Sequence, residues 1–391
     1  MGFASSNRIG VYAVKEVTMG VVPTNPVFET LRITSESVNF NITNTNSAEL
    51  RSDRMDSGAV QTGAESAGDM NFEFSAKTFD TLLESGLADE FKGGLVATRS
   101  FDVSEVVAAT NKFVTSTNPT SNASFKVGRW VKTVGLSAEN TGFFKIVTVA
   151  ADGITVEGTL TNETVTVGTD AKVIAGERLI NGVKESSYLI QKFIQDADTP
   201  TYLNYHGMRV NTVNFSVSVG AIVTGSFSFI GLNSEAVETQ YTGSTINPPS
   251  TTDPMSSVSD IMDVMIDDLP VGCFNSLTVA INNSLRGQDC VGKLGHVGIA
   301  FGSLEVTGNI SLYFRNKYDY DKYVNSEYGS ISFRFEDNAR NAYVLTIPRM
   351  KYETGSIVAG GKDQDLMFEG TYRAQADPAT NSMIIIDRFV D

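Results

Sequence analysis

The chain has 391 residues, of which 19% are charged, with a formal net charge of −15 and a pI near 4.7. This length accommodates about two to four domains. The acidic balance argues against a protein that grips nucleic acid, because such proteins carry basic patches that neutralise phosphates. It is compatible with a surface past which DNA slides without binding.

The two cysteines, Cys273 and Cys290, fit neither a zinc-binding spacing nor a CxxC motif. So few thiols in a chain of this size favour a reducing compartment, and whether the two pair is left open. The first residues lack the apolar core of a signal peptide. No stretch approaches the roughly 18 consecutive apolar residues of a membrane-spanning helix, so no membrane span is expected.

Short segments of alternating apolar and polar residues recur along the chain, at 37–43, 69–75, 276–282, 309–314 and 330–336. This period of two is typical of a half-buried strand, with one apolar and one polar face. Glycine and Asn/Asp clusters separate the segments, as they do at turns. The pattern predicts an antiparallel all-β fold built from sandwiches.

A charged loop, SAELRSDRMDSG (47–58), follows the first of these strands. The residues at the centre of this loop are Glu49, Leu50, Arg51, Asp53 and Arg54. Interspersed opposite charges between two strands favour an assembly loop that contacts a neighbouring chain. A solvated hairpin tip is the alternative, since exposed ion pairs contribute little, and a catalytic site is the least favoured reading.

The chain also contains an internal repeat of long period, and such self-similarity is the sequence signature of a duplicated fold. In chain order, the matched segments are 37–44 with 276–283, 68–77 with 308–317, 187–210 with 329–352, and 220–231 with 355–370. Each copy includes a short helix with one apolar stripe at i, i+3, i+4 spacing. The stripe residues are Phe79, Leu82 and Leu83 in the first copy and Tyr320, Tyr323 and Val324 in the second.

The first copy is interrupted between about residues 93 and 183, whereas the second runs straight through. The interruption alternates in short bursts and predicts a small inserted β-barrel or sandwich, with Trp130 in its core or at its base. We therefore expect the first fold over 1–92 plus 184–240, the inserted domain over 93–183, a linker over 241–270 and the second fold over 271–391.

The end of the linker, MSSVSDIMDVMIDDL (255–269), is acidic and has apolar residues at helical spacing. A short amphipathic helix and an extended linker draped over a neighbour are both compatible with it. Its aspartates do not follow the spacing of a calcium-binding loop.

No enzyme motif stands out. The two histidines, His206 and His296, have no nucleophile elbow or catalytic pattern around them, and no phosphate-binding or dinucleotide-binding motif is present. We expect no enzymatic activity, no catalytic or metal residues and no cofactor, and favour a structural or binding role.

The segments ELRSDR (49–54) and TFDTLLE (78–84), separated by a Gly-rich stretch and a strand, resemble the tail tube proteins (major tail proteins) of long-tailed bacteriophages, the siphophages. The resemblance covers residues 8–120 and 180–391 and leaves the inserted domain outside it. It implies two tandem tail-tube β-sandwiches, each with a flanking helix, that contribute strands to a β-barrel shared around a ring.

The same resemblance implies partners and a location. Copies of this chain would form trimeric rings with pseudo-sixfold symmetry, stacked into a tube through which DNA is ejected into the host. The tape measure protein and tail terminator or tip proteins would be further partners. The protein would be made in the host bacterial cytoplasm and reside in the virion tail, with the inserted domain on the outer surface.

Two other functions would require different features of the sequence. A surface adhesin or carbohydrate-binding protein would present an exposed aromatic platform, for which the inserted domain offers Trp130, Phe143 and Phe144. An enzyme such as a glycosidase would need two carboxylates at a defined separation in a cleft.

Overall fold

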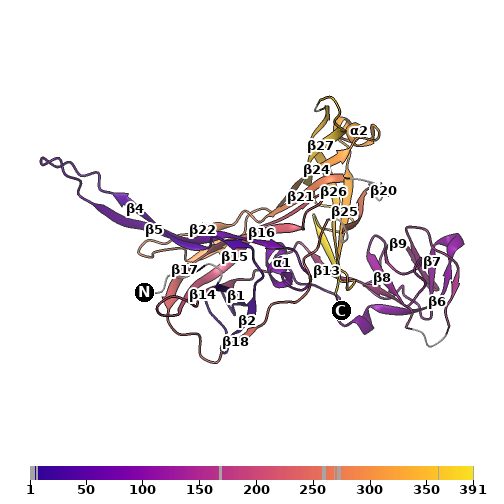
Figure 1. Cartoon of the computed structure of the whole chain (residues 1–391), viewed down its shortest axis with the longest axis horizontal. Helices are drawn as coiled ribbons and strands as arrows, with labels where there is room; N and C mark the ends of the chain where they lie inside the picture. Colours follow the sequence, from indigo (N-terminus) through magenta and orange to yellow (C-terminus); the bar gives the residue numbers. More distant parts are fainter. Residues whose placement is uncertain are drawn as a thin grey trace.

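The computed structural model describes residues 5, 8–166, 170–257, 261–267, 269–270, 274–359 and 361–390 (Figure 1). This part of the chain is mainly β-strand, with two α-helices, α1 (Asp80–Leu87) and α2 (Tyr318–Asn325), and two 3₁₀ turns at Val96–Thr98 and Ala108–Thr110. The expected all-β fold with a short helix in each copy is confirmed. Cys273 lies outside the described residues, and Cys290 is a free, exposed thiol.

The strands of the first copy flank the insertion. They are β1 (Ile9–Lys15), β2 (Val27–Thr30), β3 (Ser35–Glu36), β4 (Asn39–Asn46), β5 (Ala59–Glu73), β13 (Glu177–Ile180), β14 (Tyr188–Ile194), β15 (Thr201–Ser218), β16 (Thr224–Gly231) and β17 (Asn233–Val237). The remaining strands after them are β18 (Thr245–Asn247), β19 (Ile261–Ile266), β20 (Leu269–Pro270), β21 (Phe274–Asn282), β22 (Arg286–Gln288), β23 (Gly298–Ala300), β24 (Glu305–Tyr313), β25 (Gly329–Glu336), β26 (Ala342–Ala359), β27 (Leu366–Ala374) and β28 (Ile385–Phe389).

A continuous eight-stranded antiparallel sheet joins the two copies, in the order β4–β5–β16–β15–β21–β24–β27–β26. At its centre the C-terminal half of β15 pairs with β16 on one side and with β21 on the other. The N-terminal half of β15 leaves this sheet and pairs with β14 and β17. The two copies are therefore joined edge to edge by main-chain hydrogen bonds.

The two copies follow the same plan down to single residues. β15 and β26 each carry a bulge beside the same type of hydroxyl pair, Thr212 with Ser228 at 2.7 Å and Thr354 with Thr371 at 2.8 Å. Bulges of this kind are local design features of a strand, so their recurrence fixes which residues correspond. On this basis β15 corresponds to β26 and β16 corresponds to β27.

For the first pair of matched segments, 37–44 and 276–283, the structure gives a correspondence that differs by two residues from the match read from the sequence. Val38 lies beside Gly68, and Val279 pairs with Gly308, so Val38 corresponds to Val279 rather than to Leu277. A shift of two residues leaves every side chain on the same face of a strand, so alternation alone does not detect it.

The helices show a similar shift. Each ends in a left-handed residue, Ala88 after α1 and Ser326 after α2. Aligning these ends places Leu82 opposite Tyr320, whereas the sequence match paired Leu82 with Tyr323. Because residues three apart lie on one helix face, the spacing of apolar residues fits both alignments.

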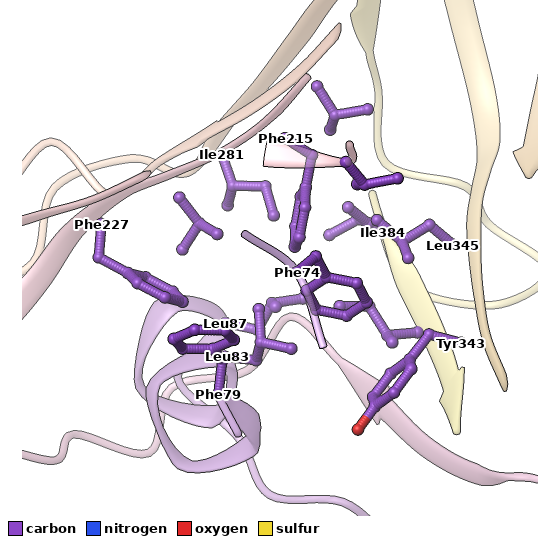
Figure 2. Close-up of a cluster of buried hydrophobic side chains, with 14 of the residues drawn as sticks. Phe74, Phe79, Leu83, Leu87, Phe215, Phe227, Ile281, Tyr343, Leu345 and Ile384 are labelled. Carbon is purple, nitrogen blue, oxygen red and sulfur yellow. The ribbon is translucent and has the colours of Figure 1, made fainter. Parts of the chain in front are cut away.

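One hydrophobic core extends across both copies. Phe74 at the end of β5 packs against Phe215, with ring centroids 5.5 Å apart, and against Tyr343 of the second copy, at 5.2 Å (Figure 2). Leu83 and Leu87 approach the same cluster from α1. A disturbance at α1 is therefore transmitted to both copies.

The insertion forms a closed six-stranded barrel. Its strands are β6 (Ser100–Val107), β7 (Lys112–Thr115), β8 (Trp130–Val134), β9 (Phe143–Ala150), β10 (Gly153–Val156), β11 (Glu163–Thr164) and β12 (Lys172–Ala175). The barrel closes in the order β6–β12–β8–β9–β10–β7–β6, and β11 adds to β6. Closure satisfies the strand edges, which lets a small β domain stand apart from the rest of the chain.

Trp130 lies at the base of this barrel, in its contact with the second copy. The indole is 2% exposed and packs with Phe143 of the barrel and with Ala342, Val344 and Phe389. The Lys132 ammonium donates to the Arg340 carbonyl oxygen at 2.9 Å in the same contact. The barrel thus packs directly against the second copy, in addition to its covalent connections to the first.

In the residues that the structure describes, the linker does not form the amphipathic helix that the apolar spacing allowed. Residues 261–266 are strand β19, which pairs antiparallel with β25. Before it, Met255 is fully buried against the first copy, where its N–H donates to the Phe74 carbonyl oxygen at 2.8 Å. The helical interpretation is therefore wrong, because pairing with β25 overrides a periodicity that is ambiguous in so short a segment.

Candidate assembly surface

The β4–β5 hairpin projects from the body of the molecule as a long arm that ends in the charged loop 47–58 (Figure 1). Toward the tip of the arm the large apolar side chains are exposed: Ile42 by 51%, Leu50 by 99%, Met55 by 61% and Val60 by 65%. Exposed apolar groups concentrated on a protruding hairpin are typical of a surface that meets another protein. The arm is therefore a candidate contact element.

Within the loop, Arg51 and Asp53 pair with each other. The Arg51 Nε donates to Asp53 Oδ1 at 3.0 Å and Nη2 donates to Oδ2 at 2.5 Å. This contact raises the pKa of Arg51 and, with the Met55 N–H, lowers the pKa of Asp53. Glu49, Leu50 and Arg54 are exposed around this pair. The pair shapes the loop, and its part in assembly stays a prediction.

Reversing the charge of Arg51 tests that part. We expect Arg51→Glu to raise the protein concentration needed for assembly, because it places two acids side by side at the end of the arm. The thermal stability should stay close to that of the unmodified chain, since the pair is solvent-exposed. Lys126→Glu, an exposed change on the barrel, is the control. Sedimentation of assembled material and thermal denaturation measure the two effects, and unimpaired assembly would refute the contact role of Arg51.

The corresponding loop of the second copy, 283–304, docks on the first copy of the same chain. The Asn283 side-chain amide donates to the carbonyl oxygens of Gly86 at 2.8 Å and Val210 at 3.1 Å. Arg209 Nη1 donates to the Ile299 carbonyl oxygen at 2.7 Å. The loop of the second copy is therefore held against the first copy by hydrogen bonds, whereas the arm of the first copy extends into solvent.

The eight-stranded sheet has two edges that carry no strand partner in the described part of the chain. One edge is β4, which pairs only with β5, and the other is 354–359 in β26, which pairs only with β27. Exposed edges with free N–H and C=O groups are templates for pairing with another chain. The corresponding positions at the centre of the sheet, β21 and 212–218 in β15, pair with each other.

The face of this sheet opposite the core is polar and acidic. Its hydroxyl and amide side chains bond across strands, as in Asn214 to Ser226 at 3.0 Å. The paired strand segments that form this face carry six carboxylates and two bases: Glu65, Asp69, Glu73, Glu305, Glu353, Glu369, Lys351 and Arg373. Arg373 contacts Glu353 at 2.5 Å and also Glu305, and these carboxylates raise its pKa. Arg373 is thus neutralised by its neighbours, and because carboxylates outnumber bases the face as a whole is negative.

The residues of the predicted helix stripes lie in two different environments. Phe79, Leu82 and Leu83 are each 1% exposed, in the core. Tyr323 packs partly against that core, whereas Tyr320 is 38% and Val324 60% exposed. In α2 the buried position is instead taken by Lys322, which pairs with Asp267. Sequence reasoning missed this pair, because Asp267 lies in the linker and only the fold brings it to α2.

The histidines occupy ordinary polar surroundings. His206 contacts Glu235 at 3.3 Å, and His296 contacts Asp289 at 2.7 Å and Glu65 at 3.8 Å. No cluster of potential metal ligands occurs among the residues that the structure describes. Within the same residues, no helix has the length and apolar character to cross a membrane. Trp130 and Phe143 are 2% and 6% exposed, so they do not form an aromatic platform for a carbohydrate.

The chain was compared with known proteins. A family model described as phage tail tube protein matches residues 6–377, nearly the whole chain. A search of curated proteins finds no match.

Proposed function

Because the chain belongs to the phage tail tube protein family, we propose that its copies close into rings that stack as the hollow tail tube of a siphophage virion. The family places the protein in the tail tube as a structural component of the virion. The ring, its symmetry and the passage of DNA are the parts that we propose.

The observation that carries the proposal is the junction between β15 and β21. This junction joins the two copies edge to edge, and each chain has the same two kinds of edge exposed at the ends of its sheet. The same junction can be repeated between chains if β26 of one chain pairs with β3 and β4 of the next. If the sheet then closes into a barrel, these two edges are no longer exposed. Three duplicated chains then give six similar folds around the axis.

The repeat correspondence predicts the register of this junction between chains. Within the chain, Asn214 pairs with Ala280 and Phe215 with Val279. The corresponding pairs between chains are Ser356 with Asn39 and Ile357 with Val38. This register matches polar with polar residues on one face and apolar with apolar residues on the other, as a half-buried sheet requires.

The polar face of the sheet would then line the bore. A phosphate backbone binds tightly where lysine and arginine release its counterions. A lining rich in hydroxyls, amides and carboxylates, with Arg373 neutralised, would let DNA pass during ejection without being held. The inserted barrel would lie outside the tube, and the ends of the tube would meet the tape measure and the terminator or tip proteins. Synthesis would take place in the host bacterial cytoplasm.

Negative-stain microscopy of the purified protein at high concentration tests the proposal. We expect rings or tubes of constant diameter, whose cross-sections show six similar lobes and carry three chains each. Protein that stays monomeric at every concentration, even after seeding with tail tips, would overturn it.

A further inference from the structure

A pocket of about 370 Å³ lies in the second copy, between α2 and the sheet. Its lining combines buried apolar side chains (Ile266, Leu312 and Phe368) and the rings of Phe314 and Tyr318 with charged and polar side chains from 315–321. A cavity of roughly 150 Å³ lined by apolar side chains already accommodates benzene. The pocket is thus large enough for an aromatic side chain.

The corresponding place in the first copy is filled from within the chain. There the linker passes over the end of β5, and Met255 is 0% exposed. The Met255 N–H donates to the Phe74 carbonyl oxygen at 2.8 Å, and the Val223 N–H donates to the Met255 carbonyl oxygen at 2.9 Å. Thr252 Oγ1 donates to the Ala76 carbonyl oxygen at 3.0 Å beside it.

The second copy repeats the receiving part of this arrangement. Phe314 N–H donates to the Leu366 carbonyl oxygen at 2.8 Å, just as Phe74 N–H donates to that of Val223 at 2.8 Å. Phe314 corresponds to Phe74 and Leu366 to Val223 in the strand alignment. The pocket beside Phe314 in the second copy therefore corresponds to the place that Met255 occupies in the first copy.

The segment that fills the first copy has its own counterpart in the repeat. Met255 lies before β19, which pairs with β25, and β1 pairs with β14 in the same way. Ile261 pairs with Phe335 and Ile9 with Ile194, so these two isoleucines correspond. Phe3 precedes Ile9 by six residues, as Met255 precedes Ile261, and the sequences MSSVSDI and FASSNRI align over this span.

We propose that Phe3 of the next subunit in the ring inserts into this pocket of the second copy. The inference rests on the proposed function. In the proposed ring, the first copy of the next subunit adjoins the second copy of this chain, as the second copy adjoins the first within the chain. Only that arrangement brings segment 1–8 of the next subunit to this pocket. The segment would then strap neighbouring subunits together in addition to the sheet junction.

Photo-crosslinking tests this contact in the full-length chain. Phe3 is replaced by the photoreactive analogue p-benzoylphenylalanine, and unlabelled protein is assembled together with ¹⁵N-labelled protein. We expect ultraviolet light to join position 3 to residues 312–318 or 366–368 of a chain with the other isotope label, in tubes only. Tubes whose crosslinks map elsewhere, or only within one chain, would overturn the inference while leaving the proposed function intact. Failure to form tubes with unmodified chain would instead contradict the proposed function.

Substitutions give a second readout. Phe3→Asp should raise the concentration needed for assembly at least about tenfold, whereas Phe3→Leu should retain assembly. Val17→Asp, at an exposed valine in the same N-terminal region, is the matched control and should assemble normally. Normal assembly of Phe3→Asp would overturn the inference.

Discussion

Leu83→Asp will unfold the chain or leave it unable to assemble. Leu83 is 1% exposed and belongs to the core that both copies share. The change removes a buried leucine, which costs about 2–5 kcal/mol, and adds the cost of burying an unpaired charge. Since domains of this kind are stable by only about 5–15 kcal/mol, the sum approaches the whole stability of the fold.

The repeat provides the matched control for this variant. Val324 belongs to the stripe that the sequence predicts for α2 but is 60% exposed, so Val324→Asp should change the free energy of unfolding by no more than about 0.5 kcal/mol. Thermal unfolding followed by circular dichroism compares the two variants. A Leu83→Asp protein that melts like the unmodified chain would show that α1 does not pack as described.

Trp130→Ala will destabilise the contact between the inserted barrel and the second copy by about 3–5 kcal/mol, the usual cost of truncating a buried tryptophan. The indole is 2% exposed among residues from both parts, and the Arg334 guanidinium lies 4.7 Å from the Phe143 ring in the same contact. We expect the barrel itself to persist, because its own core lies elsewhere, around Phe113 and Ile146.

Limited proteolysis and urea denaturation measure this effect. In the Trp130→Ala variant the connections near 93 and 183 should be cleaved faster, and the first unfolding transition should occur at lower urea concentration. Val147→Ala, at a 40% exposed position on the same barrel, is the control. Cleavage rates equal to those of the unmodified chain would mean that Trp130 does not hold the barrel in place.

The alternating segments were sufficient to predict an all-β chain, because period-two patterning reflects one buried face and needs no knowledge of the partner strand. The same property explains the two-residue error in the repeat. Val38 and Leu277 are similar apolar side chains, and only the glycines distinguish the registers, because Gly68 lies beside Val38 whereas Gly308 pairs with Val279.

The helical interpretation of 255–269 failed for a related reason, whereas the extended alternative is not contradicted. Its apolar residues fit a helix face, but the partner strand β25 lies in the same copy and offers unsatisfied main-chain groups to residues 261–266. Local spacing contains no information about such a partner, and a segment this short has little helical stability of its own.

The candidate assembly surface was only partly visible in the sequence. The charged loop attracted notice through Arg51 and Asp53, whereas the two sheet edges did not, since their residues resemble those of any half-buried strand. The acidic face of the sheet became evident only when strand pairing placed Glu305 and Glu353 around Arg373, residues from three different strands.

Covalent trapping of the junction between chains tests the central claim most directly. Asn39→Cys and Ser356→Cys are introduced together after both natural cysteines have been replaced by serine. Directly opposed antiparallel residues have Cα atoms about 4.5–5.5 Å apart, within the range that a disulfide spans. The combination of Asn39→Cys with Val358→Cys, shifted by two residues on the same face, is the control.

We predict that oxidised assemblies of the Asn39→Cys, Ser356→Cys protein will give a covalent ladder that ends in a closed species of three chains on non-reducing gels. The shifted control should crosslink far less. Crosslinking no greater than in the control, or only within single chains, would contradict a ring closed by β26 and β4.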